Sequence, residues 1–129
     1  IGAAYTNAAG AKGTTNYAID AAQATLVTQG TREGLSPAKP PNTPNSGWLY
    51  TVGPLGVNPG GRAGFDIEPT TNAAFAAFTT QGASTLYLVD LRTGAARPLG
   101  RIGGEPVRAL AVRPLRAPAQ GTAAYPGVR

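Results

Sequence analysis

Cysteine and histidine are both absent from this sequence of 129 residues. Without cysteine the chain has no disulfide framework and no thiolate chemistry. Without histidine it lacks the usual proton shuttle and triad base, and the two absences together remove the commonest metal ligands. A calcium site needs a dense set of oxygen ligands, whereas the six carboxylates are scattered along the chain. We therefore predict a protein that is not an enzyme, with no catalytic residue, no bound metal and no cofactor.

Long apolar runs and large apolar side chains are also scarce. No run approaches the ~18 apolar residues of a membrane-spanning helix, so no transmembrane segment is predicted. The chain has three phenylalanines, one tryptophan and no methionine. It begins at Ile1 instead of methionine, which indicates that an upstream segment was removed or left out.

Glycine and proline are plentiful, with 18 and 12 residues. They lie between short apolar runs, as turns do in an all-β protein. One pattern occurs twice, in Tyr17–Asp20 and Tyr87–Asp90, each time before a turn and a second apolar run. A repeated β-hairpin predicts a propeller or a solenoid. The equivalent turn positions of Asp20 and Asp90 predict structural bonds to backbone amides, not catalysis.

The repeats divide the chain into parts of blade size. Residues 58–104 are predicted to form one complete four-stranded blade, since their length suits a propeller repeat. Residues 1–57 are predicted to form a partial blade of three strands, with a Pro-rich loop inserted at 30–47. Residues 105–112 would be the first strand of the next or closing blade, and 113–129 an irregular Pro/Arg-rich tail. The predicted fold is an all-β, partial β-propeller of about two four-stranded antiparallel blades plus one extra strand, an incomplete ring.

Five short motifs occur in an order that resembles the C-terminal half of the DUF4394 domain. They are Ile1–Asn7 (IGAAYTN), Leu26–Gly30 (LVTQG), Leu49–Val57 (LYTVGPLGV), Gly64–Ile67 (GFDI) and Pro106–Val112 (PVRALAV). The resemblance implies a bacterial, often exported, propeller-like protein without an assigned function or known catalytic residues. It also implies that Val107–Val112 is the last strand and pairs with an N-terminal half that this sequence lacks. Asn16 departs from the family pattern, in which a leucine is usual, and the loop from Arg32 to Ser46 is longer and richer in proline than expected.

Positive charge gathers near the C-terminus. The net charge is +5, and from Arg92 onward seven arginines face one acid, Glu105. This charge indicates a solvated surface, a phosphate-binding face, or a patch that docks onto an acidic protein or an anionic membrane surface. Nucleic acid is the least favoured partner, because no two arginines are adjacent and Tyr125 is the one aromatic residue among them. Arg108, Arg113 and Arg116 are the predicted contact residues.

Trp48 and Tyr50 follow the Pro-rich loop. Tryptophan and tyrosine are favoured anchors of protein interfaces, and they also serve as core filler between alanine-rich strands. Both interpretations stay open, and we name Trp48 and Tyr50 as candidate partner-binding residues. The Pro-rich loop itself is a candidate docking arm, since proline lowers the ordering cost of binding.

Asp66 and Glu68 flank Ile67, so on a strand they would project from one face. Paired carboxylates perform acid/base chemistry in glycosidases. The favoured interpretation is structural: Asp66 would cap a turn or bond backbone amides, and Glu68 would be solvated.

These observations predict a non-enzymatic structural or protein-interaction module. It would be a scaffold or accessory subunit that binds other protein subunits in an extracytoplasmic assembly, in the periplasm or at the cell surface. One alternative is a ligand-binding or hydrolytic propeller whose site lies mostly on the missing half. A second alternative is nucleic-acid binding through the basic tail.

Overall fold

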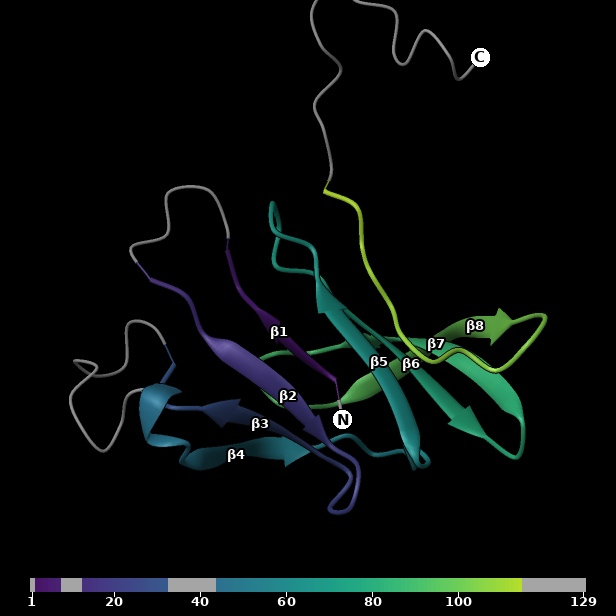
Figure 1. Ribbon diagram of the computed structural model, residues 1–129, viewed down its shortest axis with the longest axis horizontal. Coiled ribbons are helices and arrows are strands. Elements are labelled where there is room, and N and C mark those ends of the chain that lie inside the picture. The colour runs from purple at the N-terminus through teal and green to yellow at the C-terminus, as the bar shows by residue number, and fades with distance from the viewer. Residues whose placement is uncertain (1, 8–12, 33–43, 115–129) are drawn as a thin grey trace, which may run out of the picture.

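The computed structural model describes residues 2–7, 13–32 and 44–114. In this part of the chain eight strands form two antiparallel sheets, each with its four strands in chain order (Figure 1). The first sheet consists of β1 (Ala3–Tyr5), β2 (Asn16–Asp20), β3 (Thr25–Gln29) and β4 (Leu49–Pro54), with a short 3-10 helix, η1 (Pro44–Ser46), before β4. The second sheet consists of β5 (Arg62–Ile67), β6 (Ala74–Thr80), β7 (Ala83–Val89) and β8 (Ala96–Ile102). The predicted all-β fold with blade-like sheets is confirmed, and the described strands do not close a ring.

The first sheet has four strands, whereas the sequence predicts three in residues 1–57. The fourth strand is β1, in which Ala3, Ala4 and Tyr5 pair antiparallel with β2. The sequence pattern itself predicts a strand over residues 1–7, so the error lies in the number of strands assigned to this blade. The predicted partial blade is therefore a complete four-stranded sheet.

Residues 105–112 do not form the predicted extra strand. After β8 the chain turns at Gly103 and Gly104, with a φ of +85° at Gly104, and then crosses the outer face of the second sheet (Figure 1). Side-chain oxygens of that sheet bind the backbone of the segment, and no described strand lies beside it in register. The strand prediction is wrong because a strand also needs a paired neighbour. We call residues 105–114 the strap.

The hydrophobic core lies between the two sheets. Apolar side chains alternate along the strands and enter it from both sides, for example Ile19 on β2 and Phe65 and Ile67 on β5. Alanines of β6 contribute small side chains to this core, and Phe78 of the same strand fills it. Because successive strand residues point to opposite faces, each sheet has an inner face in the core and an outer face directed away from it.

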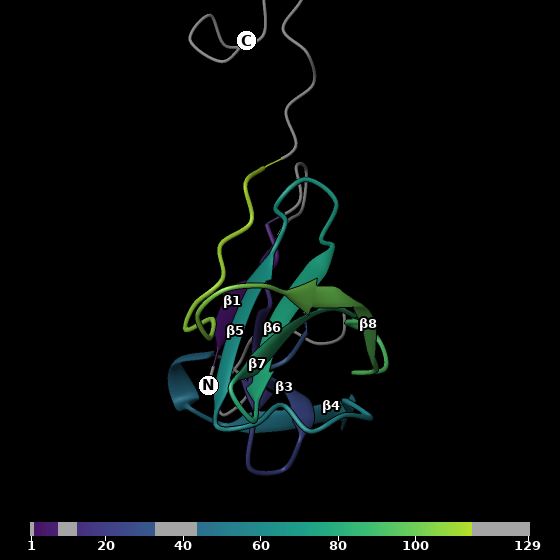
Figure 2. The ribbon, with the colours of Figure 1, turned by 90° about the vertical axis from the view of Figure 1, so that its right-hand side faces the viewer.

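The two sheets also meet backbone to backbone. A Cβ atom at Gly53 of β4 would overlap the carbonyl oxygen of Thr93, in the turn between β7 and β8. Beside this contact the amide of Ala96 donates to the carbonyl of Leu55 at 2.9 Å. Near the start of the chain, β1 packs beside β5 (Figures 1 and 2). Main-chain contacts therefore hold the sheets together in addition to the apolar core.

Candidate interaction surfaces

The strap is held to the second sheet by a closed ring of hydrogen bonds at Val107. The Val107 amide donates to Ser84 Oγ at 2.8 Å, and Thr79 Oγ1 donates to the Val107 carbonyl at 3.2 Å. The two hydroxyl oxygens lie 2.7 Å apart. Since Thr79 gives its proton to Val107, Ser84 is the donor between the hydroxyls. Two side chains thus satisfy both main-chain groups of one strap residue, which the sequence did not indicate.

The far end of the strap is held by β5. Asp66 Oδ2 accepts a hydrogen bond from the Val112 amide at 2.6 Å, and Asp66 Oδ1 accepts one from the Ile67 amide at 2.9 Å. Between these bonds the strap passes over Gly64, where an added Cβ would lie 2.9 Å from the Leu110 nitrogen. Gly64 therefore gives the strap backbone room to approach the sheet.

The predicted basic contact residues lie on this strap. Arg108 and Arg113 are both exposed there. Arg62 of β5 and Arg97 and Arg101 of β8 are exposed on the second sheet. Arg116, the third predicted residue, lies outside the described residues, as does the tail from 115 onward. Exposed positive charge therefore gathers on the strap and on the second sheet.

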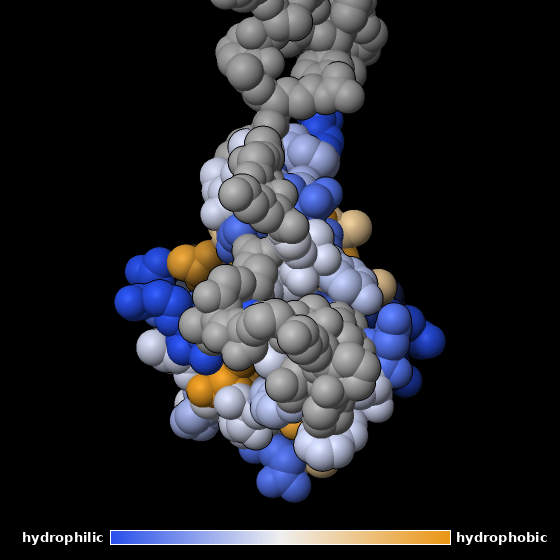
Figure 3. Space-filling model, turned by 90° about the vertical axis from the view of Figure 1, so that its left-hand side faces the viewer, coloured by the Kyte–Doolittle hydropathy of each residue, from blue (hydrophilic) through white to orange (hydrophobic). Residues whose placement is uncertain are grey.

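Trp48 and its neighbour Leu49 are exposed at the start of β4, with 57% and 59% of their surfaces accessible. Tyr5, 54% exposed, lies in the same cross-strand row as Leu49, at the opposite edge of the first sheet. Figure 3 shows the side of the molecule on which β4 lies, where hydrophobic residues reach the surface in separate spots. Exposure of Trp48 removes the core-filler interpretation for this residue. Most of the Pro-rich loop, residues 33–43, lies outside the described residues.

Tyr50, by contrast, is half-buried. It lines a pocket of about 260 Å³ together with Thr28, Thr31, Arg32 and neighbouring residues of β4. Small-molecule sites usually occupy about 300–1,000 Å³, so this pocket lies just below their range. Its position on the first sheet separates it from the arginines of the strap, and the predicted residues therefore form two surfaces instead of one site.

Between Tyr5 and Leu49 the same row of the first sheet is polar. Asn16 Nδ2 donates to Gln29 Oε1 at 3.5 Å, a long hydrogen bond. The Asn16 side-chain oxygen is buried and has no hydrogen-bond partner among the described residues. A buried amide oxygen without a partner costs stability, and Asn16 is therefore a weak point of this sheet.

Asp66 and Glu68 do not form an acid/base pair. Asp66 bonds backbone amides, as the structural interpretation predicts. Glu68 is only 3% exposed, so the prediction that it is solvated is wrong. Its carboxylate accepts hydrogen bonds from the amides of Thr70 and Thr71 at 2.9 and 2.8 Å and from the Thr71 hydroxyl at 2.7 Å. The sequence does not show that Glu68 is buried, because the burial arises when the turn after β5 folds back over the carboxylate.

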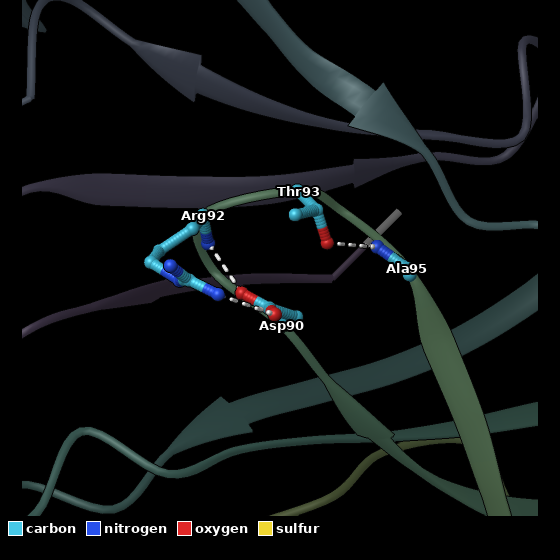
Figure 4. A network of polar contacts seen from close by, with 4 residues as sticks. All are labelled: Asp90, Arg92, Thr93 and Ala95. Atoms are coloured by element: carbon cyan, nitrogen blue, oxygen red, sulfur yellow. Dashed lines mark hydrogen bonds and ion pairs between the residues drawn. The ribbon is translucent and has the colours of Figure 1, made fainter.

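The two repeated aspartates bond backbone amides in their turns, as predicted. Asp20 Oδ1 accepts from the amides of Ala22 and Gln23 at 2.9 and 3.1 Å. Asp90 Oδ1 accepts from the Arg92 amide at 2.8 Å, and the Arg92 guanidinium lies 3.7 Å from Asp90 Oδ2 (Figure 4). The amide hydrogen bond, assisted by the charge of Arg92, lowers the pKa of Asp90 from the ordinary value of 3.8.

The lowered pKa of Asp90 gives its turn a pH dependence. A carboxyl whose pKa is lower in the folded state stabilises the fold above its unfolded pKa, and this contribution is lost as the pH falls through the folded value. Because 40% of the Asp90 side chain is exposed and solvent screens its charge, Asp90→Ala should reduce the free energy of unfolding by only about 0.5 kcal/mol at neutral pH, and the difference should shrink below pH 3.8. Urea unfolding across this range measures it. Asp90→Asn, which keeps the acceptor, should show a smaller loss, and a pH-independent deficit in Asp90→Ala would contradict the assignment.

Neither a metal centre nor a membrane helix emerges from the described ranges. Within them, no three residues among histidine, cysteine, aspartate and glutamate are placed to share a metal ion. No helix there has the length and hydropathy to cross a bilayer.

Comparison with known proteins yields one match. The family model for the domain of unknown function DUF4394 matches residues 1–111. No curated protein and no solved structure matches the chain. The match covers both sheets and most of the strap, and it carries no activity.

Proposed function

The chain belongs to the DUF4394 family of domains of unknown function, and from this premise we propose that it is a non-enzymatic protein-interaction module. Its two sheets would be consecutive blades of a larger β-sheet assembly, in which it acts as a scaffold or accessory subunit. We place this assembly outside the cytoplasm, as the resemblance to exported DUF4394 proteins leads us to expect. The proposed partners are other protein subunits whose β-sheets pack against its outer surfaces.

The observation that carries the proposal is the exposure of large apolar side chains on a sheet whose inner face is already buried. Tyr5, Trp48 and Leu49 each expose more than half of their surface. Tryptophan and tyrosine are enriched among the residues that dominate binding energy at interfaces. A stack of two sheets can extend by packing another sheet on such a surface.

The carboxylates support a structural role in the same way. Asp20, Asp66, Glu68 and Asp90 all accept hydrogen bonds from backbone amides. Each therefore has a role in shaping a turn or holding the strap. Neither alternative, ligand hydrolysis or nucleic-acid binding, gains a specific observation from the described residues.

Sedimentation velocity of the purified chain tests the proposal. We expect a species heavier than one chain at micromolar concentration, because the exposed apolar surface of the first sheet would find a second copy when its natural partner is absent. Replacing Trp48 and Leu49 by serine should reduce that species at least about tenfold in association constant, since two anchor side chains are lost. Ala95→Ser, an exposed turn change on the second sheet, should leave it unaltered. A stable, folded single chain at all concentrations would overturn the proposal.

A further inference from the structure

The middle of the strap is backbone without a main-chain partner. The bonds that hold the strap involve Val107 and Val112, which lie on either side of Arg108–Ala111. Among the described residues, no hydrogen bond joins the amides of Arg108, Ala109, Leu110 or Ala111 to another backbone group. Unpaired N–H and C=O groups in a row form a template for pairing with another strand.

The strap has the position that the first strand of a third sheet would take. A Cβ at Gly2, next to β1, would lie 2.7 Å from Phe65 Cβ of β5, so the first strands of the two sheets stack closely. A Cβ at Gly64 of β5 would lie 2.9 Å from the Leu110 nitrogen and 3.0 Å from the Ala109 carbonyl carbon. The same close approach therefore recurs one step further along the stack, from β5 to the strap (Figures 1 and 2).

Two of the four edge strands are protected against pairing. The edge strands are β1, β4, β5 and β8. β8 contains Pro98 between Arg97 and Leu99, and β4 ends at Pro54. Proline removes a backbone donor from a strand and so disfavours edge pairing. The strap has prolines only at positions 106 and 114, on either side of the segment with the unpaired amides.

The charge of the strap selects the kind of strand that fits it. Arg108 and Arg113 are exposed near its two ends, with exposed Ala109 and Ala111 between them. If residues 108–113 paired antiparallel with the same residues of a second copy, Arg108 of each copy would lie opposite Arg113 of the other. Like charges directly opposite each other destabilise a strand pair, whereas opposite charges stabilise it. A second copy is therefore disfavoured, and a strand with acidic ends is favoured.

From these observations we infer that residues 107–113 accept an extended acidic segment of a partner protein, which adds to the strap as the next strand of a third sheet. The segment would carry glutamate or aspartate at both ends, opposite the two arginines. Small or β-branched residues would lie between them, opposite the two alanines. This inference deepens the proposed function and rests on it, because it names the partner segment and the place where it binds.

Titration of the full chain with two labelled synthetic peptides tests the inference. Both are short and capped, with alternating valine and threonine; one has glutamate at each end and the other lysine. We expect the glutamate peptide to bind at least about tenfold more tightly, since two favourable cross-strand pairs replace two repulsive ones. Hydrogen exchange at alternate amides of Arg108–Ala111 should slow about tenfold or more on binding, because one added strand pairs with every second amide.

Charge reversal provides the control. The double change Arg108→Glu and Arg113→Glu should reverse the peptide preference. The matched change Arg97→Glu and Arg101→Glu, on β8, should preserve it. Failure of the glutamate peptide to bind at about 1 mM, equal binding of both peptides, or binding without protection of these amides would each overturn the inference. None of these results bears on self-association through the first sheet. The proposed function and this inference can therefore fail independently of each other.

Discussion

Gly53→Ala is expected to unfold the protein or to remove most of its stability. The added methyl group would overlap the carbonyl oxygen of Thr93, where β4 meets the turn between β7 and β8. A clash between backbone atoms cannot be relieved by a change of rotamer, so the two sheets would have to separate. We expect a loss of at least about 4 kcal/mol, which is a large part of the stability of a small domain. Thermal and urea unfolding followed by circular dichroism measure it.

The opposite side of this contact offers a second variant. Gly94 has a φ of +87°, and its added Cβ would lie 2.5 Å from the Gly53 carbonyl oxygen. Gly94→Ala should therefore also destabilise the fold strongly, through the same contact and through backbone strain. Gly61 is the matched control, because an added Cβ there meets no atom within 4 Å. Gly61→Ala should change stability by no more than about 0.5 kcal/mol, and a small effect of Gly53→Ala would show that the sheets do not meet as described.

Phe78→Ala is expected to have the second-largest effect. Phe78 is 2% exposed at the centre of the core, and its ring centroid lies 4.9 Å from that of Tyr87. Its loss would leave a cavity among alanines of the same strand, which have no side-chain length with which to fill it. We expect a loss of about 4 kcal/mol in the free energy of unfolding, measured by urea titration with an unchanged slope.

The control for the core variant is Leu99→Ala on β8. Leu99 is 47% exposed, and truncating an exposed apolar side chain leaves no buried cavity. We expect a change within about 0.5 kcal/mol. Equal losses for Phe78→Ala and Leu99→Ala would contradict the placement of the core between the sheets.

The strands with the clearest periodic signals were predicted well. β7 alternates apolar side chains between the aspartate turn and the preceding small-residue turn, and it pairs with β6 and β8. Its turn aspartate, Asp90, bonds the backbone because turn chemistry depends on neighbouring residues alone. β1 lies within the strand predicted over residues 1–7.

The interaction surfaces were predicted less completely. The sequence left two roles open for Trp48, interface anchor and core filler, and its exposure favours the interface. The roles of Ser84, Thr79 and Gly64 in holding the strap have no sequence signature, since a serine or glycine in a strand fits many environments. Whether Trp48, Tyr50, Arg108 and Arg113 contact a partner stays a prediction.

The local sequence by itself determined the all-β class, the two hairpin repeats and the aspartate turns, because alternation, glycine and aspartate act over a few neighbouring residues. Tertiary structure alone decided that Glu68 is buried, that Gly53 faces the Thr93 carbonyl and that the strap crosses a sheet face without pairing. The physical reason is that burial, close backbone approach and strand pairing each require a second segment of the chain. The residue pattern of one segment does not show which other segment lies beside it in space.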